Sequence, residues 1–106
     1  MTNIRISDAD RAEVHERIAA LRATVWAVAP RDQQDAAAEL VDELEDAIVA
    51  KAPKVSRMAF IRDWFSAHVP KLAGAASELI LSPLVRRIVA AAGDLAAAEF
   101  RNAFGP

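Results

Sequence analysis

Apolar residues recur three or four positions apart along most of this chain, the spacing that places side chains on one face of an α-helix. No stretch alternates with the period of two that a half-buried β-strand needs. The chain is therefore expected to fold into helices alone. The clearest run of apolar positions is Val14, Ile18, Leu21, Val25 and Val28.

Prolines and capping residues divide the first half of the pattern into two helices. The first is expected over residues 7–29, because Ser7 is a good N-cap and Pro30 forces the residue before it out of the α region. The second is expected over residues 31–50. The short connection around Pro30 predicts an antiparallel hairpin. The apolar positions of the second helix are Ala37, Leu40, Val41, Leu44, Ala47 and Ile48.

In the second half, a third helix is expected after the N-cap Ser56, with a break at Pro70 because proline costs about 3 kcal/mol inside a helix. A short helix then leads to Ser82. The last helix is capped by Ser82 and is expected to run without interruption to Gly105, although Gly93 weakens its middle. Apolar positions of the last helix are Leu84, Val85, Ile88, Val89, Leu95 and Phe100.

These helices predict an all-α bundle of four or five helices, in a single domain that spans residues 1–106. The N-terminal antiparallel hairpin (1–50) packs on a short aromatic helix and a long alanine-rich C-terminal helix. A chain of 106 residues buries roughly 60–70% of its unfolded surface and sustains one core. Because much of the apolar content is alanine, we expect a thin core with closely spaced helices.

Charge is divided unevenly between the two halves. Residues 1–50 carry eleven carboxylates and five arginines, whereas residues 51–106 carry eight cations and four carboxylates. Glu39, Asp42 and Glu43 lie on one face of the second helix, which alone cannot supply metal ligands from several directions. We interpret this acidic face as a surface that meets the basic half or attracts a basic partner.

The residue types of known catalytic motifs are missing. The chain has no cysteine and no tyrosine, and neither a glycine-rich phosphate loop nor a nucleophile elbow is present. His15 fails the zinc-peptidase pattern because Ala19 stands where the second histidine should be, and His68 lacks a convincing acidic partner. We expect no enzymatic activity, no cofactor and no metal. The N-terminus lacks the apolar core of a signal peptide, so a cytoplasmic location is expected.

Two alternatives to protein association remain open at this point. Residues 69–92 form the most apolar stretch and could lie against a membrane surface, but charged residues and Pro83 interrupt it too often for a transmembrane span. The basic segment from Lys51 to Arg62 suggests nucleic-acid binding, yet a pI near 5.6 argues against it.

The hypothesis that we favour is a non-enzymatic protein-interaction or assembly module, which pairs with itself or docks to a larger partner. Tryptophan and phenylalanine are the side chains that thin cores can spare for binding, and tryptophan is enriched at binding hot spots. The residues expected at the association surface are Trp26, Trp64, Phe65, Phe100 and Phe104, with Glu39, Asp42 and Glu43 supplying charge.

The C-terminal half also resembles small helical accessory segments of bacterial proteins, including some linked to defence or effector systems. The resemblance is carried by apolar and small residues and includes no catalytic signature. It implies an adaptor or assembly role in such a system and assigns no functional residue. The segments concerned are 64–70, 73–74, 82–85, 90–94 and 99–100.

Overall fold

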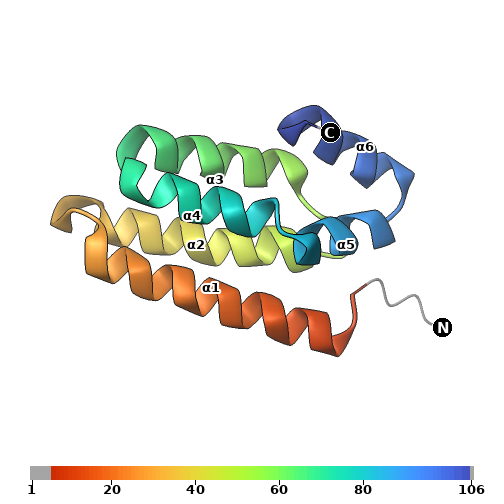
Figure 1. Cartoon of the computed structure of the whole chain (residues 1–106), viewed down its shortest axis with the longest axis horizontal. Coiled ribbons are helices and arrows are strands. Elements are labelled where there is room, and N and C mark those ends of the chain that lie inside the picture. The colour runs from red at the N-terminus through yellow and green to blue at the C-terminus, as the bar shows by residue number, and fades with distance from the viewer. Residues whose placement is uncertain (1–5, 106) are drawn as a thin grey trace.

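A computed structural model of the chain describes residues 6–105 and places them in an all-helical fold (Figure 1). Within these residues there is no strand, and six α-helices are joined by short connections. The fold measures 45 × 27 × 18 Å. The helices are α1 (Asp8–Val28), α2 (Gln34–Val49), α3 (Val55–His68), α4 (Pro70–Ile80), α5 (Pro83–Ala91) and α6 (Asp94–Phe104), with a 3₁₀ turn (Arg31–Gln33) before α2.

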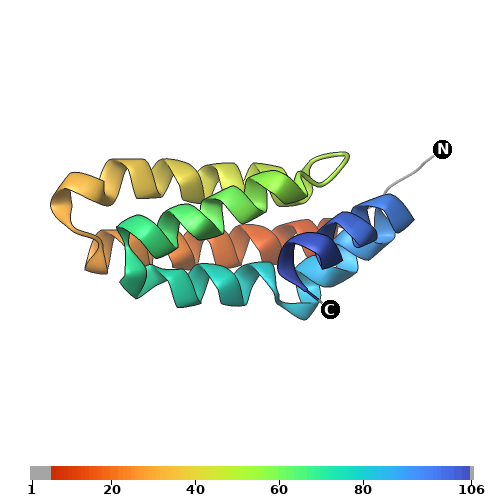
Figure 2. The ribbon, with the colours of Figure 1, turned by 90° about the horizontal axis from the view of Figure 1, so that it is seen from above.

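Helices α1 and α2 form the antiparallel hairpin that the sequence predicts (Figures 1 and 2). The Ser7 hydroxyl accepts a hydrogen bond from the Asp10 amide at 3.0 Å and so caps α1. All the apolar positions predicted for α2 are buried, as are those of α1 up to Val25. Val28, the last residue of α1, differs and is 40% exposed, although the following Ala29 is buried.

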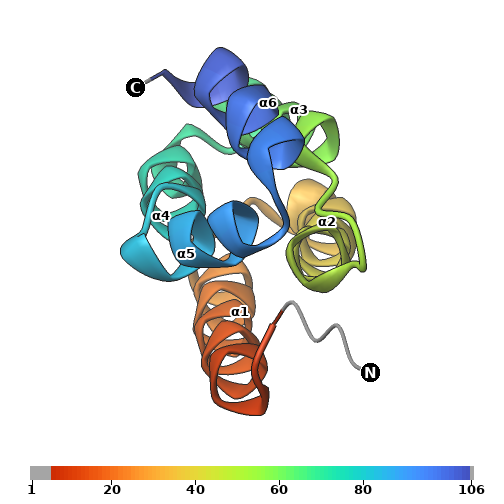
Figure 3. The same ribbon diagram turned by 90° about the vertical axis from the view of Figure 1, so that its right-hand side faces the viewer.

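The core lies between the hairpin and the pair of helices α3 and α4. The end-on view shows α3 and α4 packed above and beside α1 and α2 (Figure 3). Its larger side chains include Ile18, Leu44 and Phe65, each fully buried. Alanines share the interior with them: Ala37 and Ala76 have no exposed surface. Because alanine side chains are short, these positions allow the helix backbones to approach closely.

The break at Pro70 is confirmed, since α3 ends at His68 and Pro70 is the first residue of α4. Ser56, however, is not the N-cap of α3. The helix begins at Val55 because that side chain is buried, and the Lys54 carbonyl already accepts hydrogen bonds from the next turn. The cap at Ser82 is confirmed, with its hydroxyl 3.3 Å from the Val85 amide.

The long C-terminal helix was predicted wrongly, and its place is taken by α5 and α6. Gly93 separates them with φ +122° and ψ 174°, a conformation that is essentially restricted to glycine. The turn sends α6 back across α3, where Phe100 is buried against the core (Figure 3). Leu95 consequently leaves the apolar side that was expected for it and is 76% exposed. The bundle has six α-helices among its described residues, one more than the upper estimate from the sequence.

The apolar side chains of residues 69–92 are used within the fold. Eight apolar side chains of α4 and α5 are buried in the shared core and are 6% exposed or less, whereas Ala75, Ala90 and Ala91 are exposed. The buried residues are Leu72, Ala76, Leu79, Ile80, Leu84, Val85, Ile88 and Val89. None of the described helices combines the length and the apolar character that crossing a bilayer requires.

Candidate functional site

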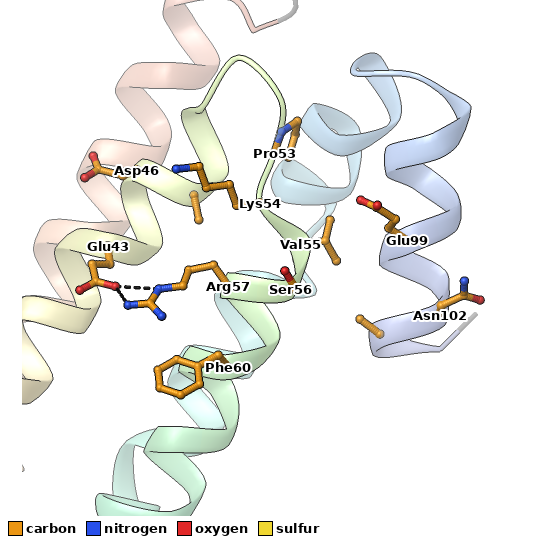
Figure 4. Close-up of a pocket in the computed structure, with 12 residues that line it drawn as sticks. Glu43, Asp46, Pro53, Lys54, Val55, Ser56, Arg57, Phe60, Glu99 and Asn102 are labelled. Carbon is orange, nitrogen blue, oxygen red and sulfur yellow. Dashed lines mark hydrogen bonds and ion pairs between the residues drawn. The ribbon is translucent and has the colours of Figure 1, made fainter.

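An open groove of about 850 Å³ runs between α2 and α6, over the beginning of α3 (Figure 4). Helix α2 forms one wall and α6 forms the other. The α2–α3 connection and the first turns of α3 form the floor. The lining residues are Glu43, Asp46, Ala47, Pro53, Lys54, Val55, Ser56, Arg57, Phe60, Glu99, Asn102 and Ala103.

The second wall of this groove depends on the turn at Gly93. Glu99, Asn102 and Ala103 all belong to α6, which reaches α3 only because the chain reverses after α5. A continuous helix in the direction of α5 would carry these residues away from α2 and α3. The groove is therefore a product of tertiary structure.

At the groove, the Arg57 side chain contacts both the Glu43 carboxylate and the Phe60 ring. The Arg57 guanidinium of α3 donates from Nε to the Glu43 carboxylate of α2 at 2.8 Å, and a second bond joins its Nη2 to the same oxygen. The guanidinium carbon also lies 4.8 Å from the centre of the Phe60 ring, within cation–π range. Arg57 is thereby neutralised and held, while Phe60 keeps 48% of its surface exposed.

Other charged groups at the groove have no ion-pair partner among the described residues. Asp46 lies on the α2 wall and Glu99 on the α6 wall, and both are exposed. Lys54 stands between the walls, on the α2–α3 connection (Figure 4). After the Glu43–Arg57 pair is set aside, the lining residues include two carboxylates and one cation.

The outer face of α1 is a second unusual surface. Trp26 is 48% exposed there and makes no ring contact with another described aromatic or cationic side chain. The other five positions in the row of exposed side chains that contains Trp26 are four alanines and Glu16, while exposed charged residues such as Arg11 and Arg17 lie to either side of this row. The exposed residues that follow this face are Ala9, Ala12, Glu16, Ala19, Ala23 and Trp26.

The other aromatic residues predicted for association lie in or against the core. Phe65 is fully buried and Phe100 is 5% exposed, so neither can be reached by a partner without opening the fold. Trp64 is half-buried, edge-on to Phe65 with ring centroids 5.4 Å apart. Phe104 packs against Phe100 at 4.8 Å. Of the predicted set, Trp26 is the aromatic side chain with the most accessible surface.

The acidic residues predicted on α2 have different surroundings. Asp42 pairs with Arg22 of α1, within the hairpin, and Glu43 pairs with Arg57. Glu39 is exposed and has no ion-pair partner among the described residues. The acidic face thus meets the basic half at Glu43 only.

A second ion pair between the two halves of the chain lies near the N-terminal end of α1. Arg87 of α5 donates to the Asp10 carboxylate at 2.9 Å. This hydrogen bond holds the pKa of Asp10 below its ordinary value. Complementary charge between the halves, predicted from the sequence, therefore forms ion pairs within one chain, at Glu43–Arg57 and at Asp10–Arg87.

The two histidines are engaged in local contacts. His15 Nδ1 lies 2.9 Å from a Glu45 oxygen, and His68 Nδ1 lies 3.0 Å from the Trp64 carbonyl. The His68 ring also stacks on Trp64 with centroids 4.5 Å apart. Over residues 6–105, histidine and acidic side chains do not gather in threes where a metal ion could bind.

Sequence reasoning did not assign Phe60, Glu99 or Asn102 to a site. Phe60 could have been recognised from its position, because it falls on the side of α3 opposite Met58, Ile61 and Phe65. A large aromatic side chain outside the apolar face of a helix indicates a surface contact. Nothing comparable marks the α6 residues, because their position depends on the reversal at Gly93.

Comparison of the chain with protein-family models, with curated proteins and with solved structures found no match.

Proposed function

We propose that this chain is a non-enzymatic protein-association module and that α1 pairs with α1 of a second copy. The observation that carries the proposal is Trp26, a large ring that is 48% exposed in a row of exposed positions that otherwise holds four alanines and Glu16. A solvent-facing helix surface is normally polar and charged. Exposed tryptophan in such a setting is typical of a binding hot spot.

Helix α1 has an apolar inner face and, on its outer side, a narrow row of mostly small side chains. Val14, Ile18 and Val25 face the core. On the opposite side, the residues from Ala9 to Trp26 are spaced alternately by three and four, which is the spacing of a helix-packing seam. Glu16 is the one charged residue in this seam. Alanine at most of its positions allows a second helix to approach to about 8 Å between axes.

The seam is self-complementary when two copies of α1 pair antiparallel. Ala12 then lies opposite Ala23 of the second copy, and Glu16 lies opposite Ala19. Trp26 lies opposite Ala9, so the largest side chain of the seam meets one of the smallest. A two-fold axis produces each of these contacts twice, as an isologous interface requires.

The expected affinity follows from the size of the contact. Residues 9–26 span about 26 Å of helix. A single pair of helices of that length buries roughly 1,000 Å² in total, at the lower limit of specific interfaces. The dimer should therefore be weak and reversible, with dissociation in the micromolar range or above, and its energy concentrated at the two Trp26 side chains.

Cysteine cross-linking tests the register directly, because the native chain has no cysteine. Ala12→Cys combined with Ala23→Cys should give a covalent dimer under mild oxidation. Either single variant should stay monomeric, since the two copies of one such residue lie about 16 Å apart along the helices, beyond disulfide reach. A double variant that does not cross-link, or single variants that do so equally well, would refute this pairing.

Sedimentation velocity provides an independent measurement. Trp26→Ala should abolish concentration-dependent association of the wild-type chain. Phe60→Ala is the matched control, because that ring is also 48% exposed but lies on α3. A wild-type chain that stays monomeric to millimolar concentration, or an equal loss in both variants, would contradict pairing through α1.

A further inference from the structure

We propose that two copies of this chain exchange α6, so that α6 of each copy occupies the site on α3 of the other. In the exchanged dimer the backbone at Gly93 is helical, and α5 and α6 form one continuous helix. The segment that enters the site has the same sequence as the one that leaves it, so the contacts of α6 are reproduced between copies. Each groove would then combine α2 and α3 of one copy with α6 of the other. The proposal does not depend on pairing through α1, which contributes no residue to the groove.

A single residue separates the reversed chain from a continuous helix. Helix α5 ends at Ala91, Ala92 still has a helical backbone with φ −78° and ψ −14°, and α6 begins at Asp94. Gly93 alone departs from helical values, with φ +122° and ψ 174°. Rotation about the two backbone bonds of Gly93 therefore converts the reversal into a straight continuation, and glycine permits both conformations. Short hinges of this kind favour exchange of an element between copies.

Joining the two helices satisfies backbone groups that the reversal leaves without helical partners. The first amides of α6, those of Asp94, Leu95 and Ala96, have no acceptor within the helix. Gly93 precedes them and has no side chain that could cap the helix. In a continuous helix these amides would donate to the carbonyls of residues 90–92, at the end of α5. Exchange therefore adds one helical hydrogen bond for each of these amides.

Helix α6 is attached to its own chain by less apolar burial than its neighbours. Among its residues only Phe100 is buried, whereas α4 and α5 each have four buried residues. Phe104 is partly buried and packs against Phe100, and its ring centre lies 4.8 Å from the Arg62 guanidinium carbon. Segments with few buried apolar contacts open at low free energy. Helix α6 is therefore the helix that leaves the fold most readily.

An exposed leucine beside the hinge favours the same rearrangement. Leu95 is 76% exposed, which makes it the most exposed large apolar side chain that the structure describes. In a continuous helix it would follow Leu84, Ile88 and Ala91 at spacings of four, three and four, on a different face from Phe100. The two continuous helices of an exchanged dimer pass each other near the hinges. Their Leu95 side chains would meet there and leave water, which stabilises the dimer.

Refolding at high concentration tests the exchange. Every chain in the test carries Trp26→Ala, so that the result is independent of α1 pairing. The chains are unfolded in urea, refolded at millimolar concentration and analysed by size-exclusion chromatography with light scattering. A fraction of dimer that survives dilution is expected, because separation requires α6 of both copies to detach. Refolding at low micromolar concentration should give monomers, since exchange requires two open chains to meet.

Glycine-to-alanine changes test the role of the hinge. Gly93→Ala penalises the reversed backbone and favours the helical one in both copies, so the association constant of the dimer should rise about a hundredfold or more. Gly74→Ala is the matched control, because it lies within α4 and affects monomer and dimer equally. Far-UV circular dichroism checks that each variant is helical.

A longer hinge should have the opposite effect. Two further glycines inserted after Gly93 prevent α5 and α6 from joining, while they still allow α6 to fold back onto its own α3. The dimer of the parent chain should then disappear. This variant keeps the proposal testable if Gly93→Ala does not fold.

Isotope-filtered NMR identifies the contact that joins the two copies. A dimer refolded from equal amounts of ¹³C-labelled and unlabelled chains should show nuclear Overhauser effects between the Phe104 ring of one copy and the Arg62 side chain of the other, since these groups are in contact. Pairing through α1 would leave this contact within each chain.

Any of three results would overturn the exchange. The first is a folded Gly93→Ala chain that stays monomeric after refolding at millimolar concentration. The second is a chain with the longer hinge that dimerises as much as its parent. The third is a dimer in which the contact between Phe104 and Arg62 is found only within each copy.

Discussion

The same change, glycine to alanine, should have opposite effects at Gly93 and Gly74. Gly93 has φ +122°, in a region that non-glycine residues occupy at a cost of about 1–3 kcal/mol. Gly74 lies in the middle of α4, is exposed, and has no atom within 4 Å of the position that a Cβ would take. At Gly74, alanine replaces glycine inside a helix and should stabilise the fold by about 0.5–1 kcal/mol.

The net effect at Gly93 includes a compensating term. Alanine restricts the unfolded chain and returns roughly 0.4–1 kcal/mol, so Gly93→Ala should destabilise by up to about 2.6 kcal/mol. For a chain of this size each kcal/mol shifts the melting temperature by about 4–5 °C. We expect Gly93→Ala to melt up to about 12 °C below wild type, and Gly74→Ala to melt about 2–5 °C above it.

The measurement is thermal unfolding followed by circular dichroism at 222 nm, with urea unfolding to confirm the free energies. It distinguishes two conformations of the C-terminal region. If residues 83–105 formed one continuous helix, Gly93 would be helical and alanine would stabilise it as at Gly74. An increase in melting temperature for both variants would therefore refute the reversal at Gly93 and, with it, the α6 wall of the groove.

Three further predictions concern the core, one ion pair and one helix cap. Phe65→Ala should destabilise by about 3–5 kcal/mol in urea unfolding because it empties a fully buried site, whereas Phe60→Ala on the same helix should cost less than about 1 kcal/mol; equal losses would contradict the burial of Phe65. The pKa of Asp10 is depressed by Arg87, so this carboxylate stabilises the fold above its unfolded pKa of about 3.9 and loses that contribution as pH falls through the lower folded pKa; Asp10→Asn should therefore lower the melting temperature at pH 7 and lower it by less as the pH falls below about 3.9, and a deficit that is independent of pH would rule out this linkage. Ser82→Ala should cost about 0.5–2 kcal/mol, because its hydroxyl caps α5 and is 6% exposed, and no change in the urea midpoint would show that the cap contributes nothing.

Much of the local structure could be predicted from particular residues. Ser7 and Ser82 cap helices as their side chains suggest, and Pro70 starts a new helix because it lacks the amide that a continuing helix would need. The prediction of Ser56 as an N-cap is wrong because burial of Val55 favours a helix that begins one residue before Ser56. A capping residue sets the end of a helix unless burial of a neighbouring side chain contributes more free energy than the cap.

The candidate surfaces could be predicted less well. Trp26 was identified from its residue type and is exposed, but Phe65 was identified in the same way and is in the core. Residue type cannot separate these two, since both are large aromatics on apolar helices. Their burial is settled by what packs against each helix face, and only the arrangement of α1 to α4 provides that information.

By itself, the sequence determined that the chain is all-helical, that α1 and α2 form an antiparallel hairpin, and that acidic and basic halves have complementary charge. These properties depend on spacing, caps and composition, which act over a few residues. Only the tertiary structure decided that the chain reverses at Gly93, that Asp10 reaches Arg87, and that Glu99 faces α2 across a groove. Glycine permits both a helical and a reversed backbone at residue 93, and the burial of Phe100 against the core selects the reversed one.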